Sequence, residues 1–322
     1  MRNIKTLLIT GTGSLARRLM YRWKDRYDRI VAVSRGETTH LNLPEWVIGE
    51  LCDVRDYNRL DYLFSAYQPM DVIHTSAYKV LGLMQNYAME CFKTNVIGTN
   101  NVAALSHKYK VSRSLLIATD KACNPIHHQN YAISKAMARN IYVDYAARPS
   151  DTSFLCCIYG NIIRSKNSMI PKWENLIKED KEVVIYHEDL TRFMFSLDDS
   201  VDLINKTLNF NLSGTTTIPI MDSYRIVDVA KALGIILNKE VKIKILNQLL
   251  PGEKMNEEMT SINESHLIKQ LDPKTLCVVP SFDIGKDYSY LKPYSGLPLR
   301  SDNCIDNNIN NIINLINRST VD

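Results

Sequence analysis

Short apolar runs and amphipathic helical stretches alternate through the first half of the chain. The runs have strand length and lie at residues 5–10, 29–34, 46–50, 71–75, 115–118 and 152–158. Between the first two, apolar residues recur on one helical face: Leu15, Leu19, Met20 and Trp23. Nearly continuous apolar strands separated by helices are typical of a parallel sheet covered on both faces. The pattern therefore predicts an α/β fold with a Rossmann-type, doubly wound parallel sheet.

A glycine-rich turn follows the first apolar run. Residues 11–16 read Gly-Thr-Gly-Ser-Leu-Ala, which is G-x-G-x-x-A between a strand and a helix. Gly11 permits the tight turn, Gly13 lets the backbone approach a pyrophosphate, and Ala16 allows close helix–strand packing. The helix N-terminus then faces the phosphates. This arrangement predicts a dinucleotide site with contacts from Gly11, Thr12, Gly13, Ser14 and Leu15.

The end of the second run bears on which dinucleotide is bound. An NAD site usually has an acidic residue there for the ribose 2′-hydroxyl, and this chain has none. Ser34 closes the strand, and the guanidinium of Arg35 after it suits a 2′-phosphate. We therefore predict NADP, with a solvated loop arginine as the alternative. Asp53, next to Val54, is placed either to contact the adenine or to cap the following helix.

The α/β alternation loosens beyond residue 160, which indicates a second, smaller unit. The pattern there predicts a strand at 194–197 and helices at 198–208, 226–233 and 255–259. We assign 1–160, with about 194–216, to an NADP-binding Rossmann domain, and about 161–193 with 217–300 to a substrate-binding lobe. The stretch 301–322 predicts a helix that packs on the body, because its isoleucines share one face: 305, 309, 312, 313 and 316.

Thr119, Tyr131 and Lys135 form a candidate catalytic group. Thr119 follows the run at 115–118, at the sheet edge where open α/β proteins bind ligands. Tyr131 and Lys135 are four residues apart in a predicted helix and so share a face. A cation beside the phenol favours the phenolate, which can then accept a proton near neutral pH. The alternative is a surface helix whose Tyr and Lys have no joint role.

Further polar residues follow the fourth run. Ser76, Ala77 and Lys79 lie at the same predicted edge. A helical stretch at about 86–109 contains Asn95, whose side chain either reaches the strand-end backbone or faces solvent. The adjacent histidines at 127 and 128 are too few to hold a metal, so we expect none.

Composition narrows the class of protein. The chain has 322 residues, 45% of them hydrophobic, and a net charge of +4. These values suit a soluble globular protein and do not indicate a nucleic-acid partner. No apolar run approaches the roughly 20 residues that span a bilayer, so we expect no membrane association. Seven cysteines without C-x-x-C spacing indicate reduced thiols, and no signal peptide is evident, so we expect a cytoplasmic protein.

Short blocks along the chain resemble one known family. They are Ala77-Tyr78-Lys79, Lys93-Thr94-Asn95, Thr119-Asp120-Lys121-Ala122, Asn124-Pro125, Tyr159-Gly160-Asn161, Thr191-Arg192-Phe193 and Pro251-Gly252-Glu253-Lys254. In order and spacing, from about residue 5 to 259, they resemble the extended short-chain dehydrogenase/reductases, and among these the inverting UDP-N-acetylglucosamine 4,6-dehydratases (5-epimerases). The Asp-Lys pair distinguishes this branch from the retaining dTDP-glucose dehydratases, which typically carry Asp-Glu.

The chain departs from that family pattern at several places. The glycine loop is one residue shorter, and the segment between Lys121 and Tyr131 is two residues longer. Where the family often has an acidic residue before the long helix, this chain has Gln85. The family's Arg before Pro-Gly-Glu-Lys is replaced by Leu250, and its His after that block by Asn256. The family's Ser-Arg-Gly-Ser is Ser-Lys-Asn-Ser at 165–168. Diphosphate binding is therefore expected to rest more on Lys166 and Lys254, or the nucleotide to sit differently.

The resemblance implies an NADP-dependent lyase of nucleotide-sugar biosynthesis that acts on UDP-N-acetylglucosamine. Tyr131, helped by Thr119 and Lys135, would take the C4 hydroxyl proton while hydride passes to NADP. Lys121 would remove the C5 proton, once burial near other cations lowers its pKa. Asp120, protonated, would release the C6 hydroxyl as water. Hydride return to C6 and reprotonation of C5 on the other face would give UDP-2-acetamido-2,6-dideoxy-β-L-arabino-hex-4-ulose.

The resemblance also implies binding residues and an assembly. For the cofactor these are Gly11, Thr12, Gly13, Ser14, Leu15, Ser34, Arg35, Asp53, Val54, Ser76, Ala77, Lys79, Asn95, Tyr131, Lys135 and Tyr159. For the substrate they are Lys79, Asn161, Lys166, Ser168, Met169, Arg192 and Lys254. A homo-oligomer, dimer or hexamer, would pair helices near 86–109 and 131–147. The alternatives are a retaining dehydratase or 4-epimerase of another nucleotide sugar, and a non-catalytic NADP-sensing protein.

Overall fold

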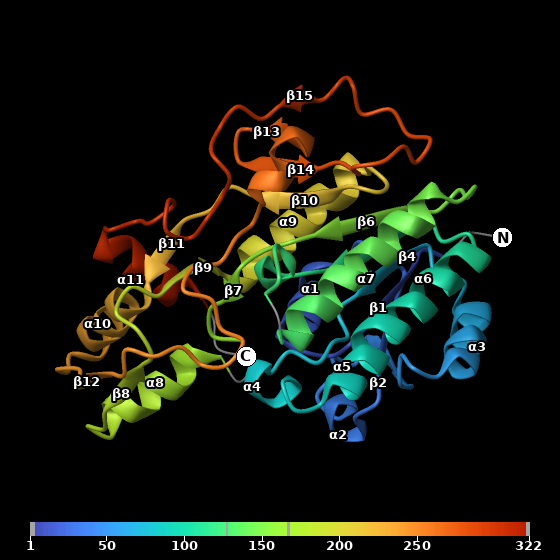
Figure 1. Ribbon diagram of the computed structural model, residues 1–322. Helices are drawn as coiled ribbons and strands as arrows, with labels where there is room; N and C mark the ends of the chain where they lie inside the picture. Colours follow the sequence, from blue (N-terminus) through green and yellow to red (C-terminus); the bar gives the residue numbers. More distant parts are fainter. Residues whose placement is uncertain (1–3, 127, 166–167, 320–322) are drawn as a thin grey trace.

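A ten-stranded sheet forms the centre of the protein (Figure 1). The computed structural model describes residues 4–126, 128–165 and 168–319. The parallel part of the sheet has the order β3-β2-β1-β4-β5-β6-β10. These strands are β1 (Thr6–Thr10), β2 (Arg29–Ser34), β3 (Val47–Leu51), β4 (Asp71–His74), β5 (Arg113–Ile117), β6 (Ser153–Cys157) and β10 (Thr216–Pro219).

Helices cover both faces of this sheet, because the side chains of each strand alternate between two apolar cores. Leu7 and Ile9 pack with α1 (Ser14–Arg22) and α9 (Leu197–Phe210) on one face. Leu8, between them, packs on the other face with α3 (Tyr57–Tyr67) and α6 (Gly98–Lys108). Beside α6, the second face also carries α7 (Asn130–Ala147), and the short α2 (Glu37–His40) links β2 to β3. The doubly wound fold predicted from the sequence is confirmed.

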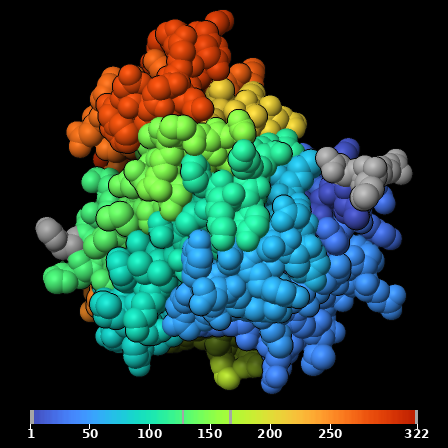
Figure 2. Space-filling model, turned by 90° about the vertical axis from the view of Figure 1, so that its right-hand side faces the viewer, coloured from blue at the N-terminus to red at the C-terminus, as the bar shows by residue number. Residues whose placement is uncertain are grey.

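The far end of the sheet differs from the expected division of the chain. Strands β14 (Thr275–Val278), β13 (Ile268–Asp272) and β15 (Lys292–Pro293) extend the sheet antiparallel beyond β10. The sequence pattern assigns these residues to the substrate lobe, whereas the structure pairs them with the central sheet. They join the Rossmann sheet because β10 would otherwise be an edge strand with unpaired backbone groups. Figure 2 shows this extension (orange) rising above the body of the protein.

A smaller lobe stands beside the carboxyl ends of the parallel strands (Figure 1). It contains two small sheets, β11-β9-β7 and β12-β8, with helices packed on them. Its elements are β7 (Asn161–Ile162), α8 (Met169–Lys178), β8 (Val183–Ile185), β9 (Thr191–Phe195), β11 (Ser223–Arg225), α10 (Ile226–Leu237), β12 (Ile243–Ile245) and α11 (Ile309–Arg318). Helix α11 packs against α10 through Ile312, Leu315 and Ile316. It is shorter than the predicted 301–322, because Ile305 forms a β-bridge with Ser223 outside the helix.

Two helix predictions need correction. The stretch at 86–109 is not one regular helix, because α5 (Ala88–Phe92) and α6 are joined by a π-helical turn, η1 (Lys93–Ile97). Residues 255–259 are not helical: Glu257 N donates to Ser301 Oγ and Met259 N to Leu299 O, so their amides bond to a distant segment. The remaining short helices are α4 (Leu81–Met84), η2 (Asp120–Ala122) and η3 (Ile262–Leu267).

Candidate active site

A cavity of about 1010 Å³ opens at the carboxyl ends of the parallel strands and continues into the smaller lobe. This is the place where open α/β sheets bind ligands. Most of the predicted site residues line it: Gly11, Thr12, Gly13, Ser14, Leu15, Ser34, Arg35, Asp53, Val54, Ser76, Ala77, Lys79, Thr119, Lys121, Tyr131, Lys135, Tyr159, Asn161, Ser168, Met169 and Arg192. Asp120, Asn95 and Lys254 lie behind its wall, and Lys166 lies outside the described residues.

The glycine turn has the geometry that a dinucleotide requires. Gly11 has φ +95°, and a Cβ there would lie 2.6 Å from Thr75 Oγ1, so no side chain fits. A Cβ on Gly13 would meet nothing within 4 Å and would point into open space at the cavity wall. Helix α1 begins directly after it, at Ser14. Backbone amides at a helix start, with space before them, fit a pyrophosphate.

Arg35 and Asp53 lie together at the end of β2. The Arg35 side chain is 48% exposed, stacks on the ring of Tyr78 at 4.7 Å, and has Nη1 3.8 Å from Asp53 Oδ2. Asp53 is also held by Arg55 at 2.7 Å, whereas the N-cap of α3 is Asp56. The helix-capping alternative for Asp53 is therefore wrong.

Asn95 shapes the site from within the π-helical turn. Its Oδ1 accepts from Tyr78 N at 2.8 Å, and its Nδ2 donates to Tyr78 O at 3.1 Å and to Ser134 Oγ at 3.0 Å. The side chain thus joins the loop after β4 to α7. Of the two sequence alternatives, contact with the strand-end backbone is the one found.

Asp120 and Lys121 meet because the chain turns immediately after β5. The turn η2 starts at Asp120, so two consecutive side chains reach the same side instead of opposite faces. Asp120 is fully buried, and its Oδ1 accepts from Thr119 Oγ1 at 2.8 Å. Lys121 Nζ lies 3.3 Å from that oxygen and 3.1 Å from Asn161 Oδ1.

Lys121 has a neighbour that the sequence did not reveal. Glu257 is 2% exposed, and its Oε1 lies 3.3 Å from Lys121 Nζ. No local pattern indicates this contact, because the sequence predicts a helix at 255–259. Burial lowers the pKa of Lys121, but Asp120 and Glu257 outweigh it and raise that pKa to about 12. The expected cationic surroundings are not found: of the groups acting on this pKa, Arg192 is the cation, and its effect is smaller.

At the start of α7, Lys135 is buried and Tyr131 is half-buried at the cavity, but their relation differs from the expected one. Lys135 Nζ donates to Ile117 O at 2.6 Å, and burial lowers the pKa of this lysine to about 8. Burial raises the pKa of Tyr131 to about 12, while Lys121 and Thr119 oppose that rise. The cation that favours the Tyr131 phenolate is therefore Lys121, which approaches from η2.

Two of the expected substrate-binding cations are held by protein groups. Arg192 Nη2 donates to Glu253 Oε1 at 2.7 Å and to Lys254 O at 2.9 Å, although its side chain also lines the cavity. Lys254 Nζ donates to Cys123 O at 2.8 Å, away from the cavity. The smaller lobe contributes a mainly apolar wall, with Trp173 and Tyr186 among its residues.

The amino-acid sequence of this chain is similar to those of known proteins. Residues 7–278 match the model of a family described as polysaccharide biosynthesis protein. The chain belongs to this family. An inverting UDP-N-acetylglucosamine 4,6-dehydratase of Campylobacter jejuni is 33% identical, over 84% of this chain and 82% of the relative. A UDP-glucose 4-epimerase of Rickettsia rickettsii is 32% identical, over 89% of this chain and 86% of the relative.

The protein is thus a nucleotide-sugar-modifying enzyme of the extended short-chain dehydrogenase/reductase type, and the predicted resemblance is confirmed. Its fold matches Pen from Bacillus thuringiensis with a TM-score of 0.88, 25% identity and 97% coverage of both chains. WbmG from Bordetella bronchiseptica, solved with NAD and UDP, shares the fold at a TM-score of 0.63 and 19% identity, over 77% of this chain and 83% of that one. Within the described ranges, no helix is long and apolar enough to cross a bilayer.

Proposed function

We propose that this enzyme is an NADP-dependent UDP-N-acetylglucosamine 4,6-dehydratase that inverts C5. The observation that carries the proposal is Lys121, which lines the cavity close to Tyr131 and lies 3.3 Å from the buried Asp120 behind the cavity wall. Elimination of water needs a group that removes the C5 proton and a group that protonates the leaving oxygen. A lysine and a carboxyl in contact supply both.

The residues of the chain divide the reaction among them. Tyr131 would take the proton of the C4 hydroxyl, with Thr119 and Lys121 favouring its phenolate. NADP, when bound along the glycine turn, would supply the hydride acceptor at C4 and the hydride donor at C6. Lys121 would remove the C5 proton, which the 4-ketone acidifies. Asp120, whose pKa burial raises, would protonate the departing C6 hydroxyl.

The assignment of NADP rests on Arg35 at the end of β2. Its guanidinium is partly exposed at the cavity and is held over Tyr78, which leaves its edge available to a 2′-phosphate. Asp53 at 3.8 Å competes for the same cation. Because Arg55 already pairs with Asp53 at 2.7 Å, Arg35 can turn toward a phosphate without leaving that carboxylate unpaired.

A 4-epimerase is the second candidate, because a UDP-glucose 4-epimerase is among the relatives. That reaction needs oxidation at C4 and no elimination, so it would use Tyr131 and Thr119 but give Asp120 and Lys121 no chemical task. The buried acid–lysine pair therefore favours the dehydratase.

Product analysis tests the choice. Purified protein incubated with UDP-N-acetylglucosamine in D₂O should give, by NMR, a 4-keto sugar with a C6 methyl group, deuterium at C5 and the L-arabino configuration. A product with retained D-configuration would point to a retaining dehydratase. In a parallel incubation with UDP-glucose, formation of UDP-galactose without loss of water would point to the epimerase. Cofactor binding without turnover of any UDP-sugar would contradict both.

The Lys121→Ala variant tests the role of the lysine. It should still bind the cofactor and oxidise C4, seen as reduced cofactor absorbance in a single turnover, although more slowly because the cation that favours the Tyr131 phenolate is gone. It should lose elimination and C5 deuterium exchange. Elimination at the wild-type rate would show that Lys121 is not the base.

A further inference from the structure

Lys121 lies between two buried carboxylates from distant parts of the chain. Asp120 Oδ1 and Glu257 Oε1 each lie 3.3 Å from Lys121 Nζ. Glu257 Oε1 is also 3.9 Å from Arg192 Nε, while Asp120 Oδ2 and Glu257 Oε2 have no hydrogen-bond partner among the described residues. A buried lysine that contacts two carboxylates is held charged. The resting lysine must therefore lose a proton before it can act as a base.

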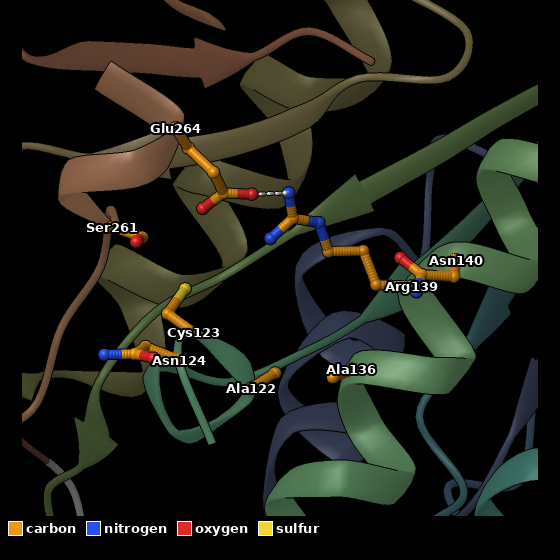
Figure 3. Close-up of a pocket in the computed structure, with 8 residues that line it drawn as sticks. All are labelled: Ala122, Cys123, Asn124, Ala136, Arg139, Asn140, Ser261 and Glu264. Atoms are coloured by element: carbon orange, nitrogen blue, oxygen red, sulfur yellow. Dashed lines mark hydrogen bonds and ion pairs between the residues drawn. The ribbon is translucent and has the colours of Figure 1, made fainter. Parts of the chain in front are cut away.

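The loop that carries Glu257 is held by the segment around Ser301 and, through Lys254 and Met259, by Cys123 next to the catalytic turn. Glu257 N donates to Ser301 Oγ at 2.8 Å, and Ser301 N donates to Glu257 O at 2.9 Å. Farther along the chain, Arg139 of α7 forms an ion pair of 2.6 Å with Glu264 of η3 (Figure 3). This ion pair lies beside a second cavity of about 220 Å³. The backbone of Glu257 is thus held on both its N–H and its C=O by Ser301, and its carboxylate lies beside Lys121.

We propose that Glu257 is a positioning residue that holds Lys121 against Asp120, so that one proton moves from Lys121 Nζ to Asp120 Oδ1 before elimination. The inference rests on the proposed dehydratase function. In this transfer one N–H bond breaks and one O–H bond forms, and the total charge of the pair does not change. The products are a neutral amine and a protonated carboxyl, which are the forms that elimination requires.

Elimination then returns the pair to its resting form. Lys121 takes the C5 proton and becomes an ammonium, while the electron pair of the C5–H bond forms the C5–C6 double bond. The C6–O pair leaves with the oxygen, which takes the Asp120 proton and departs as water. The ion pair seen in the structure is therefore also the state after water loss, and the step needs no outside acid or base.

The surrounding charges decide which carboxylate receives the proton. Burial raises the pKa of Asp120 and Glu257 raises it further, against the opposing effects of Lys121, Thr119 and Arg192. Burial also acts to raise the pKa of Glu257, but the cations around it, Lys121, Arg192 and Lys254, lower it below its usual range. Tyr131 is the remaining titratable group that acts on Lys121. Glu257 stays ionised and Asp120 is the acceptor.

The Glu257→Gln variant tests the proposal through the pH dependence of elimination. At low pH Asp120 is already protonated, so Lys121 has no acceptor and the rate falls. Removing the Glu257 charge lowers the proton affinity of Asp120. The acid limb of the rate of C5 deuterium exchange should therefore move to lower pH by about one unit. At its optimum the rate should fall by about 10²-fold, because Lys121 is held less firmly.

Matched variants separate this role from a structural one. Glu258→Gln makes the same change one residue away, where the side chain contacts Asn124 at 3.5 Å. This variant should leave the acid limb of C5 deuterium exchange at its wild-type pH. Glu257→Asp keeps the charge but moves it from Lys121, so its limb should lie between wild type and Glu257→Gln. If circular dichroism shows that Glu257→Gln does not fold, the pH of the acid limb in Glu257→Asp tests the role of Glu257 instead.

The outcomes are distinct. A wild-type enzyme that does not dehydrate UDP-N-acetylglucosamine overturns the proposed function. A wild type that does, with an unmoved acid limb in Glu257→Gln and Glu257→Asp, overturns the role of Glu257 and leaves the function standing.

Discussion

Lys121 shows how far a residue's chemistry depends on neighbours that are remote in sequence. Its contact with Asp120 follows from two adjacent positions and the turn after β5. Its contact with Glu257 joins residues 136 positions apart in sequence, brought within 3.3 Å by the fold. The first could be predicted from a motif. The second reverses the expected pKa shift of the lysine, and no local pattern indicates it.

The phenol of Tyr131 should be needed for the first oxidation. Tyr131→Phe removes only the hydroxyl from a side chain that lines the cavity, so the fold should be kept while turnover falls by about 10²–10⁴-fold. Rapid-mixing absorbance of reduced cofactor measures the step, and circular dichroism controls for folding. Near-normal turnover would mean that another group takes the C4 proton.

Arg35 should discriminate between the two dinucleotides. Because its guanidinium would pair with a 2′-phosphate, Arg35→Ala should weaken NADP(H) binding by about ten-fold or more while changing NAD(H) binding little. Fluorescence titration with both reduced cofactors measures the difference. An equal loss for both would contradict the assignment of NADP.

At the scale of elements, the π-helical turn η1 is the clearest departure from the sequence pattern. The stretch at 86–109 fits one long helix, and no local sequence feature marks a single π-helical turn. The turn matters because it brings Thr94 and Asn95 inward, where Asn95 bonds to the backbone after β4. Asn95 is only 1% exposed, and this buried bonding role explains why an asparagine of low helix propensity stands there.

The glycine turn between β1 and α1 gives a matched pair of variants. Gly11→Ala would force a Cβ to 2.6 Å from Thr75 Oγ1 at φ +95°, so it should destabilise the fold by about 1–3 kcal/mol and weaken cofactor binding. Gly13→Ala meets no atom within 4 Å, so its stability should stay near wild type while cofactor binding falls. Urea unfolding and cofactor titration measure the two effects. Equal destabilisation in both variants would show that the space before α1 is not the reason for Gly13.

At the scale of the whole molecule, we expect a symmetric dimer through the α5–α7 region. Phe92, Ile97, Ile133 and Met137 are each between 40% and 47% exposed, and they come from α5, η1 and α7, which pack together. Apolar side chains gathered on one surface favour burial against a second copy. Light scattering at micromolar concentration should show an oligomer, and Met137→Asp should shift it toward monomer. A wild type that is monomeric under these conditions would refute the assembly.

The sequence alone determined the Rossmann sheet, the glycine turn and the residues at the strand ends, because each depends on local period, turn chemistry and motif spacing. Tertiary structure alone decided the rest. It joined 268–293 to the central sheet, since an exposed β10 edge needed partners, and it directed Lys254 to Cys123 O and away from the cavity. It also placed Glu257 beside Lys121. In the same way it placed Lys135 Nζ within hydrogen-bond distance of Ile117 O. These contacts join segments far apart in the chain, and buried charges and backbone groups must find such partners because water cannot reach them.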